Sequence, residues 1–349
     1  ARIEAVLNRA SAGSVMRDYR LDSIKASLIF LVVFGHVIEA AAPGSPMLSR
    51  IYDFLYLFHM PAFIFLNGYV VKERFTVNYQ TIFYKLIIPF VALSLLYELA
   101  ELIIYRDVSS YIKNGAPNWI LWYLYSLIFW KLLTPLFMRL RFALVISVIV
   151  SVAVSFVDFD GYAFGILRTL VFFPFYIAGV QAASSNRLRL ENVFNPKAAC
   201  VGAVILLLSY LFGDRFGTAL LYGSSTFPAL DEGLREAALM RLGHYLLAGL
   251  CIYAFCALTW WWRGLAKIGT RTLFIYALHG LVVKYLLWDA LQKLNAPWQV
   301  AVAALAAATG LAWLLSRDGV KRLMDGWIAL VGLVLAPREN RRSQKQAKG

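Results

Sequence analysis

The chain has 349 residues, of which 60% are hydrophobic and 15% are charged, and its mean hydropathy is +0.65. Soluble domains average roughly 45–50% apolar and about 25% charged residues, so this composition excludes a water-soluble enzyme and indicates a polytopic membrane protein. A formal net charge of +14 also occurs in nucleic-acid-binding proteins, but basic residues in a membrane protein first reflect the sidedness of its loops. The three cysteines lie in apolar runs, which excludes a disulfide-rich ectodomain and offers no metal-ligand spacing.

Ten stretches are long and apolar enough to cross the hydrocarbon core of a membrane, which takes about 20 helical residues. They are predicted at residues 24–41, 53–71, 82–105, 118–138, 142–158, 163–184, 197–213, 241–260, 268–288 and 298–316. Residues 1–20 are polar, so we expect no cleavable signal and expect the first span to direct insertion. The predicted fold class is all-α, with about ten transmembrane helices.

The loops between these spans differ in charge from one side to the other. Most Lys and Arg residues lie on the side of the N-terminus, as does the basic C-terminal tail. By the positive-inside rule we expect both termini in the cytoplasm and the protein in the cytoplasmic (inner) membrane. The stretch 323–336 is too short to span comfortably and predicts an interfacial helix. The expected domains are a cytoplasmic segment 1–23, a ten-helix membrane domain 24–316, and the helix and tail 317–349.

Ionisable side chains inside a membrane cost several kcal/mol each, so those that persist usually face a cavity or a partner. In the first span, Lys25 and His36 are eleven residues apart, which places them on nearly one helix face and roughly 16 Å apart along the axis. Glu39 follows one turn after His36, where a carboxylate can orient the ring. The span therefore carries a cation near one end and an imidazole near the other.

The second predicted span carries a histidine at a matching depth. His59 lies about six residues from the outer end of its span and His36 about five from that of its own, and sequential helices are usually neighbours. Pro61 has no backbone N–H, so it leaves backbone groups beside His59 without their helical hydrogen bonds. A buried packing histidine is the alternative for either residue, but two at one depth favour a site.

Further polar and aromatic candidates lie in later spans. Arg168 is at the depth of the two histidines, where it either binds an acidic sugar or an oxyanion, or extends to the lipid headgroups. Glu98 can neutralise Arg168 or a histidine. The outer segment 214–240 either caps a cavity or is a solvated loop. The other candidates are Glu101, Trp122, Tyr123, His244, Arg271 and His279.

Several motifs together resemble the acyltransferase-3 family of membrane O-acyltransferases, with the fucose 4-O-acetylase-like branch most similar. They are Lys25-X10-His36, Phe58-His59-Met60-Pro61, Leu66-Asn67-Gly68-Tyr69, Leu121-Trp122-Tyr123-Leu124-Tyr125, Phe173-Pro174-Phe175-Tyr176-Ile177-Ala178-Gly179 and Tyr276-Ala277-Leu278-His279-Gly280. Many members have Arg in place of Lys25 and Ser in place of Asn67. Lysine keeps the positive charge but lacks the bidentate fork of arginine.

The resemblance implies transfer of an acyl group from cytoplasmic acyl-CoA to a hydroxyl of a carbohydrate or other envelope acceptor. On that basis we expect His36 to act as general base with Glu39, and His59 to orient the acceptor or stabilise the oxyanion. Residues expected to contact the CoA phosphates are Lys25, Lys72, Arg74 and Arg271. Residues expected at the acceptor or oxyanion are Asn67, Trp122, Tyr123, Arg168 and His279. A two-step route through an acylated side chain stays open.

Acetyl-CoA is the expected donor substrate, succinyl-CoA is an alternative, and no permanently bound cofactor or metal is expected. Expected partners are the acyl-CoA, a carbohydrate acceptor such as an exopolysaccharide or its lipid-linked precursor, membrane lipid and the polysaccharide biosynthesis machinery, but not nucleic acid. A transporter or flippase for a lipid-linked sugar is the main rival function, since membrane His, Glu and Arg residues also form substrate paths. A noncatalytic component of an export complex is the third hypothesis.

Overall fold

The computed structural model describes residues 18–71, 75–184, 194–262 and 264–335, and these residues form helices and loops without a strand. The long helices are α2 (Tyr19–Ile38), α3 (Pro46–Tyr69), α5 (Ile88–Tyr105), α7 (Trp122–Phe137), α8 (Ala143–Ser155), α9 (Ile166–Ser184), α11 (Pro196–Phe212), α13 (Leu234–Thr259), α15 (Thr272–Val282), α17 (Pro297–Leu315) and α18 (Asp318–Leu335). Short α-helices are α4 (Tyr79–Ile82), α6 (Ser110–Lys113), α12 (Thr218–Tyr222), α14 (Ala266–Gly269) and α16 (Trp288–Leu291). Two π-helical turns, η2 (Phe83–Ile87) and η7 (Val283–Leu287), extend α5 and α15, and 3-10 turns are η1 (Ala42–Gly44), η3 (Trp119–Leu121), η4 (Ala163–Gly165), η5 (Gly213–Phe216) and η6 (Phe227–Ala229).

The predicted all-helical polytopic fold is confirmed, and each of the ten predicted spans overlaps a helix. Among the described residues, seven helical segments are long and apolar enough to cross a membrane: Tyr19–Ile38, Tyr79–Tyr105, Trp119–Phe137, Ala163–Ser184, Leu234–Thr259, Thr272–Leu291 and Pro297–Leu315. The predicted spans 142–158 and 197–213 correspond to the shorter helices α8 and α11. Span 53–71 lies in α3, whose polar residues lower its hydropathy. The number of crossings and the side of each terminus stay predictions.

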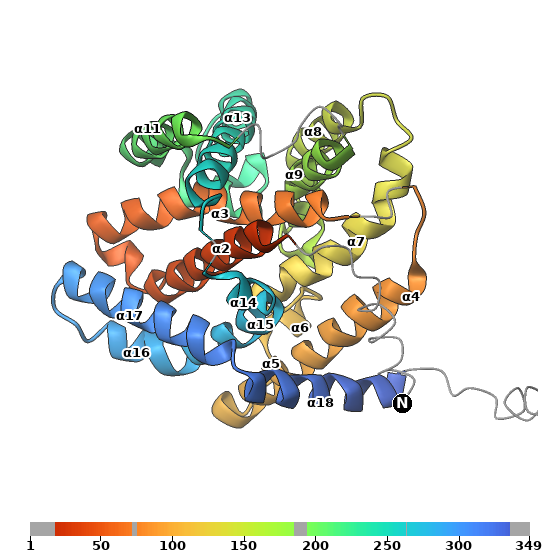
Figure 1. The fold of residues 1–349 in the computed structure, drawn as a ribbon, viewed down its shortest axis with the longest axis vertical. Helices are drawn as coiled ribbons and strands as arrows, with labels where there is room; N and C mark the ends of the chain where they lie inside the picture. Colours follow the sequence, from red (N-terminus) through yellow and green to blue (C-terminus); the bar gives the residue numbers. More distant parts are fainter. Residues whose placement is uncertain (1–17, 72–74, 185–193, 263, 336–349) are drawn as a thin grey trace, which may run out of the picture.

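Helices α2 and α3 run through the middle of the molecule, with α11, α13, α8 and α9 on one side and α16, α17 and α18 on the other (Figure 1). Helix α2 is apolar around most of its circumference, which is the pattern of a helix enclosed by others. It contacts α3, α14, α15 and α17. The central position of these two helices brings the first two polar motifs into the core.

A close helix crossing joins α3 to α9. A Cβ atom on Gly68 would lie 2.1 Å from the Tyr176 carbonyl oxygen, and a Cβ atom on Gly179 would lie 2.0 Å from the Phe65 carbonyl oxygen. Both helices therefore need glycine where their backbones meet. Gly68 in the motif at residues 66–69 and Gly179 in the motif at residues 173–179 are therefore packing residues.

Pro61 lies inside α3 and leaves the carbonyl of Leu57, four residues earlier, without its helical donor. His244 of α13 lies with Nε2 3.1 Å from that carbonyl oxygen. Since a carbonyl only accepts, His244 carries its proton on Nε2 and replaces the missing helical bond. The structure thus assigns this histidine to the packing of α3 against α13.

The helix near the C-terminus begins five residues earlier than the predicted segment 323–336, at Asp318. The Trp327 indole donates to the carbonyl of Ala92 on α5 at 2.7 Å, and Met324 and Val331 are buried. Helix α18 therefore packs on the side of α5 through its apolar face. Its interfacial placement stays a prediction, and the basic tail from residue 336 lies outside the described residues.

Candidate active site

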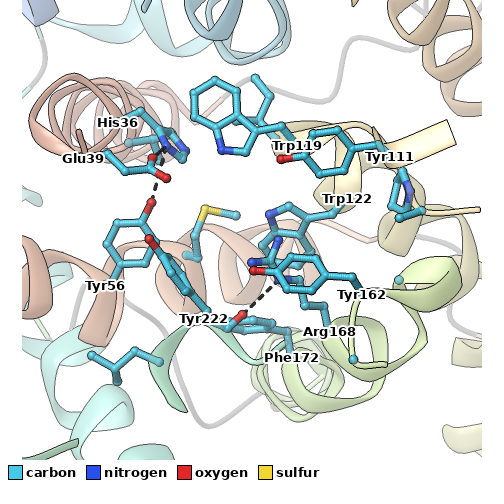
Figure 2. A pocket seen from close by; sticks show the side chains of 18 of the residues that line it. His36, Glu39, Tyr56, Tyr111, Trp119, Trp122, Tyr162, Arg168, Phe172 and Tyr222 are labelled. Atoms are coloured by element: carbon cyan, nitrogen blue, oxygen red, sulfur yellow. Dashed lines mark hydrogen bonds and ion pairs between the residues drawn. The ribbon is translucent and has the colours of Figure 1, made fainter. Parts of the chain in front are cut away.

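A cavity of about 150 Å³, here called the histidine pocket, lies where the C-terminal end of α2 meets α3. Side chains from α7, α9, α12 and α15 complete its walls, and the loop around α6 covers part of it. Figure 2 shows His36 and Glu39 at one end of this pocket and Arg168 at the other. The pocket thus joins residues from helices that are far apart in the sequence.

His36 and Glu39 form a close pair. Nδ1 of His36 lies 2.6 Å from Oε2 of Glu39, and both side chains are only partly exposed. An ionised carboxylate only accepts hydrogen bonds, so His36 carries its proton on Nδ1 and presents Nε2 as an acceptor. The backbone carbonyl of His36 also accepts the Trp288 indole proton at 2.8 Å. These contacts fix the orientation of the ring and leave Nε2 as its acceptor nitrogen.

His59 lines the same pocket from α3 and is buried. Its Nδ1 donates to the Leu55 carbonyl at 2.5 Å, and its buried Nε2 has no hydrogen-bond partner among the described residues. The Tyr56 ring separates it from His36, with ring centroids 6.2 Å from His36 and 4.7 Å from His59. His59 therefore offers a second imidazole acceptor to the pocket without touching the first.

A third histidine lies directly against His36. The ring centroid of His279 on α15 is 5.4 Å from that of His36. His279 is fully buried, its Nδ1 donates to the Ile275 carbonyl at 3.0 Å, and its Nε2 lacks a partner in the described part of the chain. The sequence placed His279 near mid-span, but only the folded chain brings it against His36.

Arg168 forms the other end of the pocket. Its Nε donates to the Tyr222 carbonyl at 3.2 Å, and its Nη2 lies 3.4 Å from the Ser224 hydroxyl. The guanidinium carbon lies 5.2 Å from the ring centroids of Trp122 and Tyr162 and 5.7 Å from that of Tyr222. These contacts hold the guanidinium inside the protein, so Arg168 lines a cavity rather than extending to headgroups.

Several lining residues were missed by sequence reasoning. Tyr56 and Tyr222 stand between the two ends with ring centroids 5.0 Å apart, and the Tyr222 and Tyr52 hydroxyls are hydrogen-bonded. Trp119 packs on His36 with ring centroids 4.9 Å apart. The position of Trp119, three residues before Trp122, is the one sequence signal for this wall. The outer segment 214–240 contributes Tyr222 to the pocket.

Three predicted acceptor residues do not line this pocket: Asn67, Tyr123 and His279, the last of which packs against the lining residue His36. Asn67 donates from Nδ2 to the Phe63 carbonyl of its own helix at 2.8 Å, two turns beyond His59 and near the α3–α9 crossing. Tyr123 is buried among Phe63, Trp130 and Tyr276 and does not line the pocket. Because successive residues of a helix point in different directions, Trp122 faces the pocket and its neighbour Tyr123 faces the core.

The predicted phosphate-binding residues are dispersed. Lys25 is partly buried on α2, and the unbroken helix separates it from His36 by roughly 16 Å along the axis. Arg271 donates to the Ser316 carbonyl and pairs with Asp318, so an incoming phosphate would have to displace that carboxylate. Lys72 and Arg74 lie outside the described residues.

A second, polar cavity of about 480 Å³ lies at the C-terminal end of α3, between α4 and α7. It is called the lysine cavity here because Lys85 and Lys131 line it, together with Asn78, Thr81 and Tyr176. The sequence reading did not single out either lysine. Residues 72–74 follow directly after Val71, which also lines this cavity.

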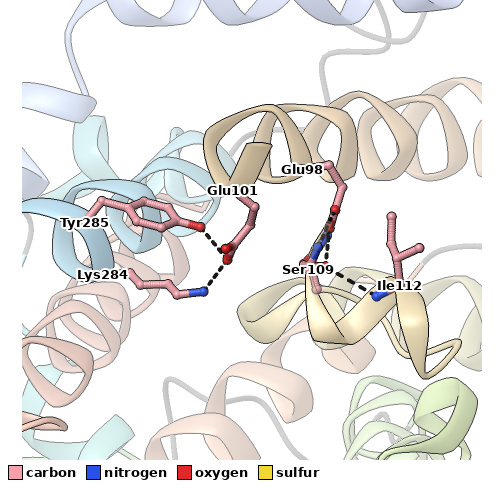
Figure 3. Close-up of polar contacts among 7 residues, drawn as sticks. Glu98, Glu101, Ser109, Ile112, Lys284 and Tyr285 are labelled. Atoms are coloured by element: carbon pink, nitrogen blue, oxygen red, sulfur yellow. Dashed lines mark hydrogen bonds and ion pairs between the residues drawn. The ribbon is translucent and has the colours of Figure 1, made fainter. Parts of the chain in front are cut away.

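Glu98 and Glu101 of α5 each hold a set of hydrogen-bond donors, and the partners of Glu98 differ from those suggested by the sequence. Glu98 accepts hydrogen bonds from the Ser109 backbone N–H at 3.1 Å, the Ser109 hydroxyl and the Asn118 amide at 2.7 Å (Figure 3). Glu101 accepts from Lys284 at 2.5 Å and from Tyr285 at 2.7 Å. The suggestion that Glu98 neutralises Arg168 or a histidine is therefore wrong, because Glu98 instead holds the loop around α6.

Comparison with known proteins places this geometry in context. The model of a family described as "Acyltransferase domain" matches residues 18–317. Nodulation protein NolL of Sinorhizobium fredii is 24% identical over 366 residues, covering 95% of this chain and 96% of that protein. Glucans biosynthesis protein C of Salmonella typhimurium is 24% identical over 294 residues, covering 66% of this chain and 76% of that protein. No solved structure matches the chain.

Proposed function

The chain belongs to the acyltransferase-3 family. We propose that it transfers an acyl group from cytoplasmic acyl-CoA to a carbohydrate hydroxyl of the cell envelope or of an exported polysaccharide, and that this acyl group is acetyl. The relative named for glucan biosynthesis supports a saccharide acceptor. The observation that carries the proposal is the His36–Glu39 pair at the wall of the histidine pocket. We place the protein in the inner membrane with its termini in the cytoplasm, on the charge asymmetry of its loops.

The proposed reaction uses His36 as general base. Nε2 takes the proton from the acceptor hydroxyl while the hydroxyl oxygen attacks the thioester carbonyl carbon. The C–O bond forms, the C–S bond breaks, and the protonated imidazole returns the proton to the departing CoA thiolate. Glu39 stabilises the imidazolium through Nδ1, because the carboxylate lies at 2.6 Å.

His59 suits an orienting role better than an oxyanion role. Its Nδ1 proton is used by the Leu55 carbonyl, so the neutral ring has only a lone pair to offer at Nε2. A lone pair accepts a hydrogen bond from a sugar hydroxyl and repels an oxyanion. We therefore assign His59 to holding the acceptor.

For the donor, the lysine cavity is a candidate phosphate site in addition to Lys25, because its two lysines and its polar Asn78 and Thr81 suit an anionic nucleotide. Arg271 is the weaker candidate, since a phosphate there would have to displace Asp318. A column of four aromatic rings runs from the lysine cavity to the histidine pocket, in the order Tyr176, Trp130, Tyr123 and Tyr276. The centroids of successive rings are 5.5 Å, 6.0 Å and 5.5 Å apart. The buried Tyr123 hydroxyl in this column has no hydrogen-bond partner among the described residues.

Purified protein in detergent provides the test. Binding of acetyl-CoA, succinyl-CoA and free CoA is measured for the wild type and for His36→Gln and Lys85→Ala. We expect Lys85→Ala to weaken binding of all three, and His36→Gln to keep binding but lose transfer to a saccharide mixture. His244→Gln is the matched control, because it removes a buried histidine that does not line the pocket.

Two results would overturn the proposal. Full transfer by correctly folded His36→Gln would exclude His36 as the base. Failure of the folded wild type to bind any CoA species, together with movement of a lipid-linked sugar across vesicles without acyl-CoA, would favour the flippase.

A further inference from the structure

We propose that the acceptor saccharide carries an anionic group, a carboxylate or a phosphate, close to the hydroxyl that receives the acyl group, and that Arg168 binds this anion. The inference rests on the proposed function, whose acceptor it specifies. Nothing in the family match or in the names of the relatives assigns a charge to the acceptor.

The guanidinium of Arg168 is anchored but not saturated. Of its five N–H donors, the Tyr222 carbonyl and the Ser224 hydroxyl use two. Both partners are neutral, and the surrounding rings of Trp122, Tyr162 and Tyr222 attract the cation without neutralising it. Donors therefore remain at a cavity wall, fixed in direction.

No Asp or Glu side chain pairs with Arg168 in the part of the chain that the structure describes. Glu39, the acid that lines the pocket, is at the opposite end and is bonded to His36 (Figure 2). Glu98, on α5, is bonded to Ser109 and Asn118. A partly desolvated cation without a counter-ion is costly, so an anionic ligand that completes its hydrogen bonds is favoured there.

The tryptophan wall links the anion site to the base. Trp119 and Trp122 are three residues apart at the turn where η3 enters α7, a spacing that aligns side chains on one side of a 3-10 turn. Trp119 packs on His36, and Trp122 packs on Arg168. An acceptor saccharide lying along these indoles reaches from His36 at one end of the pocket towards Arg168 at the other.

The experiment measures binding without an acyl donor. The probes are methyl β-D-glucuronide for the carboxylate, glucose 1-phosphate for the phosphate, and methyl β-D-glucoside as the neutral partner of both. We expect the folded wild type to bind at least one acidic probe about tenfold more tightly than the glucoside, or better, as a charge-assisted contact provides. The acidic probe whose affinity exceeds that of the glucoside by the larger factor identifies whether the anionic group of the acceptor is a carboxylate or a phosphate.

Arg168→Gln should remove this preference, and Arg168→Lys should retain part of it, because lysine keeps the charge without the fork. Arg215→Gln is the matched control, since it removes an exposed cation that does not line the pocket. Equal binding of acidic and neutral probes, binding of none of them, or an unchanged preference in Arg168→Gln overturns the proposal.

Transfer kinetics separate the anion site from an oxyanion contact. With acetyl-CoA present, the anion site predicts that Arg168→Gln raises KM for the acidic acceptor and leaves the neutral acceptor unchanged. An equal fall in kcat for both acceptors means that Arg168 acts on the oxyanion and overturns the inference. Acid-selective binding with no acyl transfer to any acceptor would instead count against the proposed function while leaving the anion site in place.

Discussion

Gly68 on α3 and Gly179 on α9 occupy the two sides of one helix crossing, and each faces backbone atoms of the other helix. Helix α3 carries Tyr56 and His59, and α9 carries Arg168 and Phe172, so this crossing sets the width of the histidine pocket. The glycines lie outside the pocket but determine how closely its two walls approach.

Gly179→Ala should destabilise the protein. The added Cβ would meet the Phe65 carbonyl oxygen at 2.0 Å, and overpacking of this kind costs roughly 1–3 kcal/mol. Thermal unfolding in detergent should show a lower Tm. Gly310→Ala on α17 is the control, because no atom lies within 4 Å of its Cβ and alanine favours helix by up to about 1 kcal/mol. Equal Tm values for the two variants would refute the close crossing.

Glu98→Gln should raise the KM for the acceptor with a smaller effect on kcat. The Ser109 hydroxyl and the Asn118 amide donate to one oxygen of Glu98, and the Ser109 backbone N–H donates to the other. Glutamine keeps one acceptor oxygen, so in either orientation its NH₂ faces an N–H donor and one of these contacts is lost (Figure 3). Loss of such a bond costs roughly 1–3 kcal/mol and loosens the α6 loop, which supplies Tyr111 to the pocket.

Glu101→Gln, one turn along α5, is the contrast for this measurement. Glu101 binds Lys284 and Tyr285 and does not line the pocket, so its variant should lose stability with an unchanged acceptor KM. A matching rise in KM for both variants would show that α5 as a whole, rather than the Glu98 contacts, positions the loop.

Glu39→Gln should lower kcat by about 100-fold or more while leaving acyl-CoA binding intact. The amide oxygen of glutamine still accepts from Nδ1 of His36, but it no longer stabilises the imidazolium that forms when the base takes a proton. Steady-state transfer kinetics measure the change. Glu236→Gln, at an exposed position on α13, provides the control. Wild-type kcat in Glu39→Gln would remove this carboxylate from the mechanism.

The Arg271–Asp318 pair should make the docking of α18 depend on pH. The hydrogen bond from Arg271, and then its positive charge, hold the pKa of the Asp318 carboxyl below its usual value. Because the pKa of Asp318 is lowered in the folded protein, the ion pair stabilises the docked helix fully at pH values above the ordinary Asp pKa of about 4. This stabilisation is lost as the pH falls through the lower pKa that Asp318 has in the folded protein.

Hydrogen-exchange protection of α18, corrected for intrinsic rates, measures this docking. At neutral pH we expect Asp318→Asn to reduce protection relative to the wild type, and the difference to vanish as the pH is lowered through the acidic range. Asp325→Asn, which removes the Lys321 pair within α18, is the control. A difference that persists unchanged in acid would mean that the carboxylate does not hold the helix.

The sequence by itself determined the features that depend on local periodicity and composition. Mean hydropathy and span length indicated the membrane class and the positions of the helices, because crossing the hydrocarbon requires about 20 apolar residues in one segment. The neighbourhood of His36 and Glu39 also followed from the sequence, because residues three apart on a helix always share a face. The α2 helix preserves this pairing in the structure.

Contacts between distant segments were decided only by the tertiary structure. The helical period predicts which residues share a face of one helix, but close backbone approaches such as that at Gly68 set which faces of two helices meet. That is why His279 lies against His36 while Asn67 and Tyr123 lie outside the pocket. The surroundings of Arg168, drawn from α7, α9 and α12, likewise exist only once those helices are packed together.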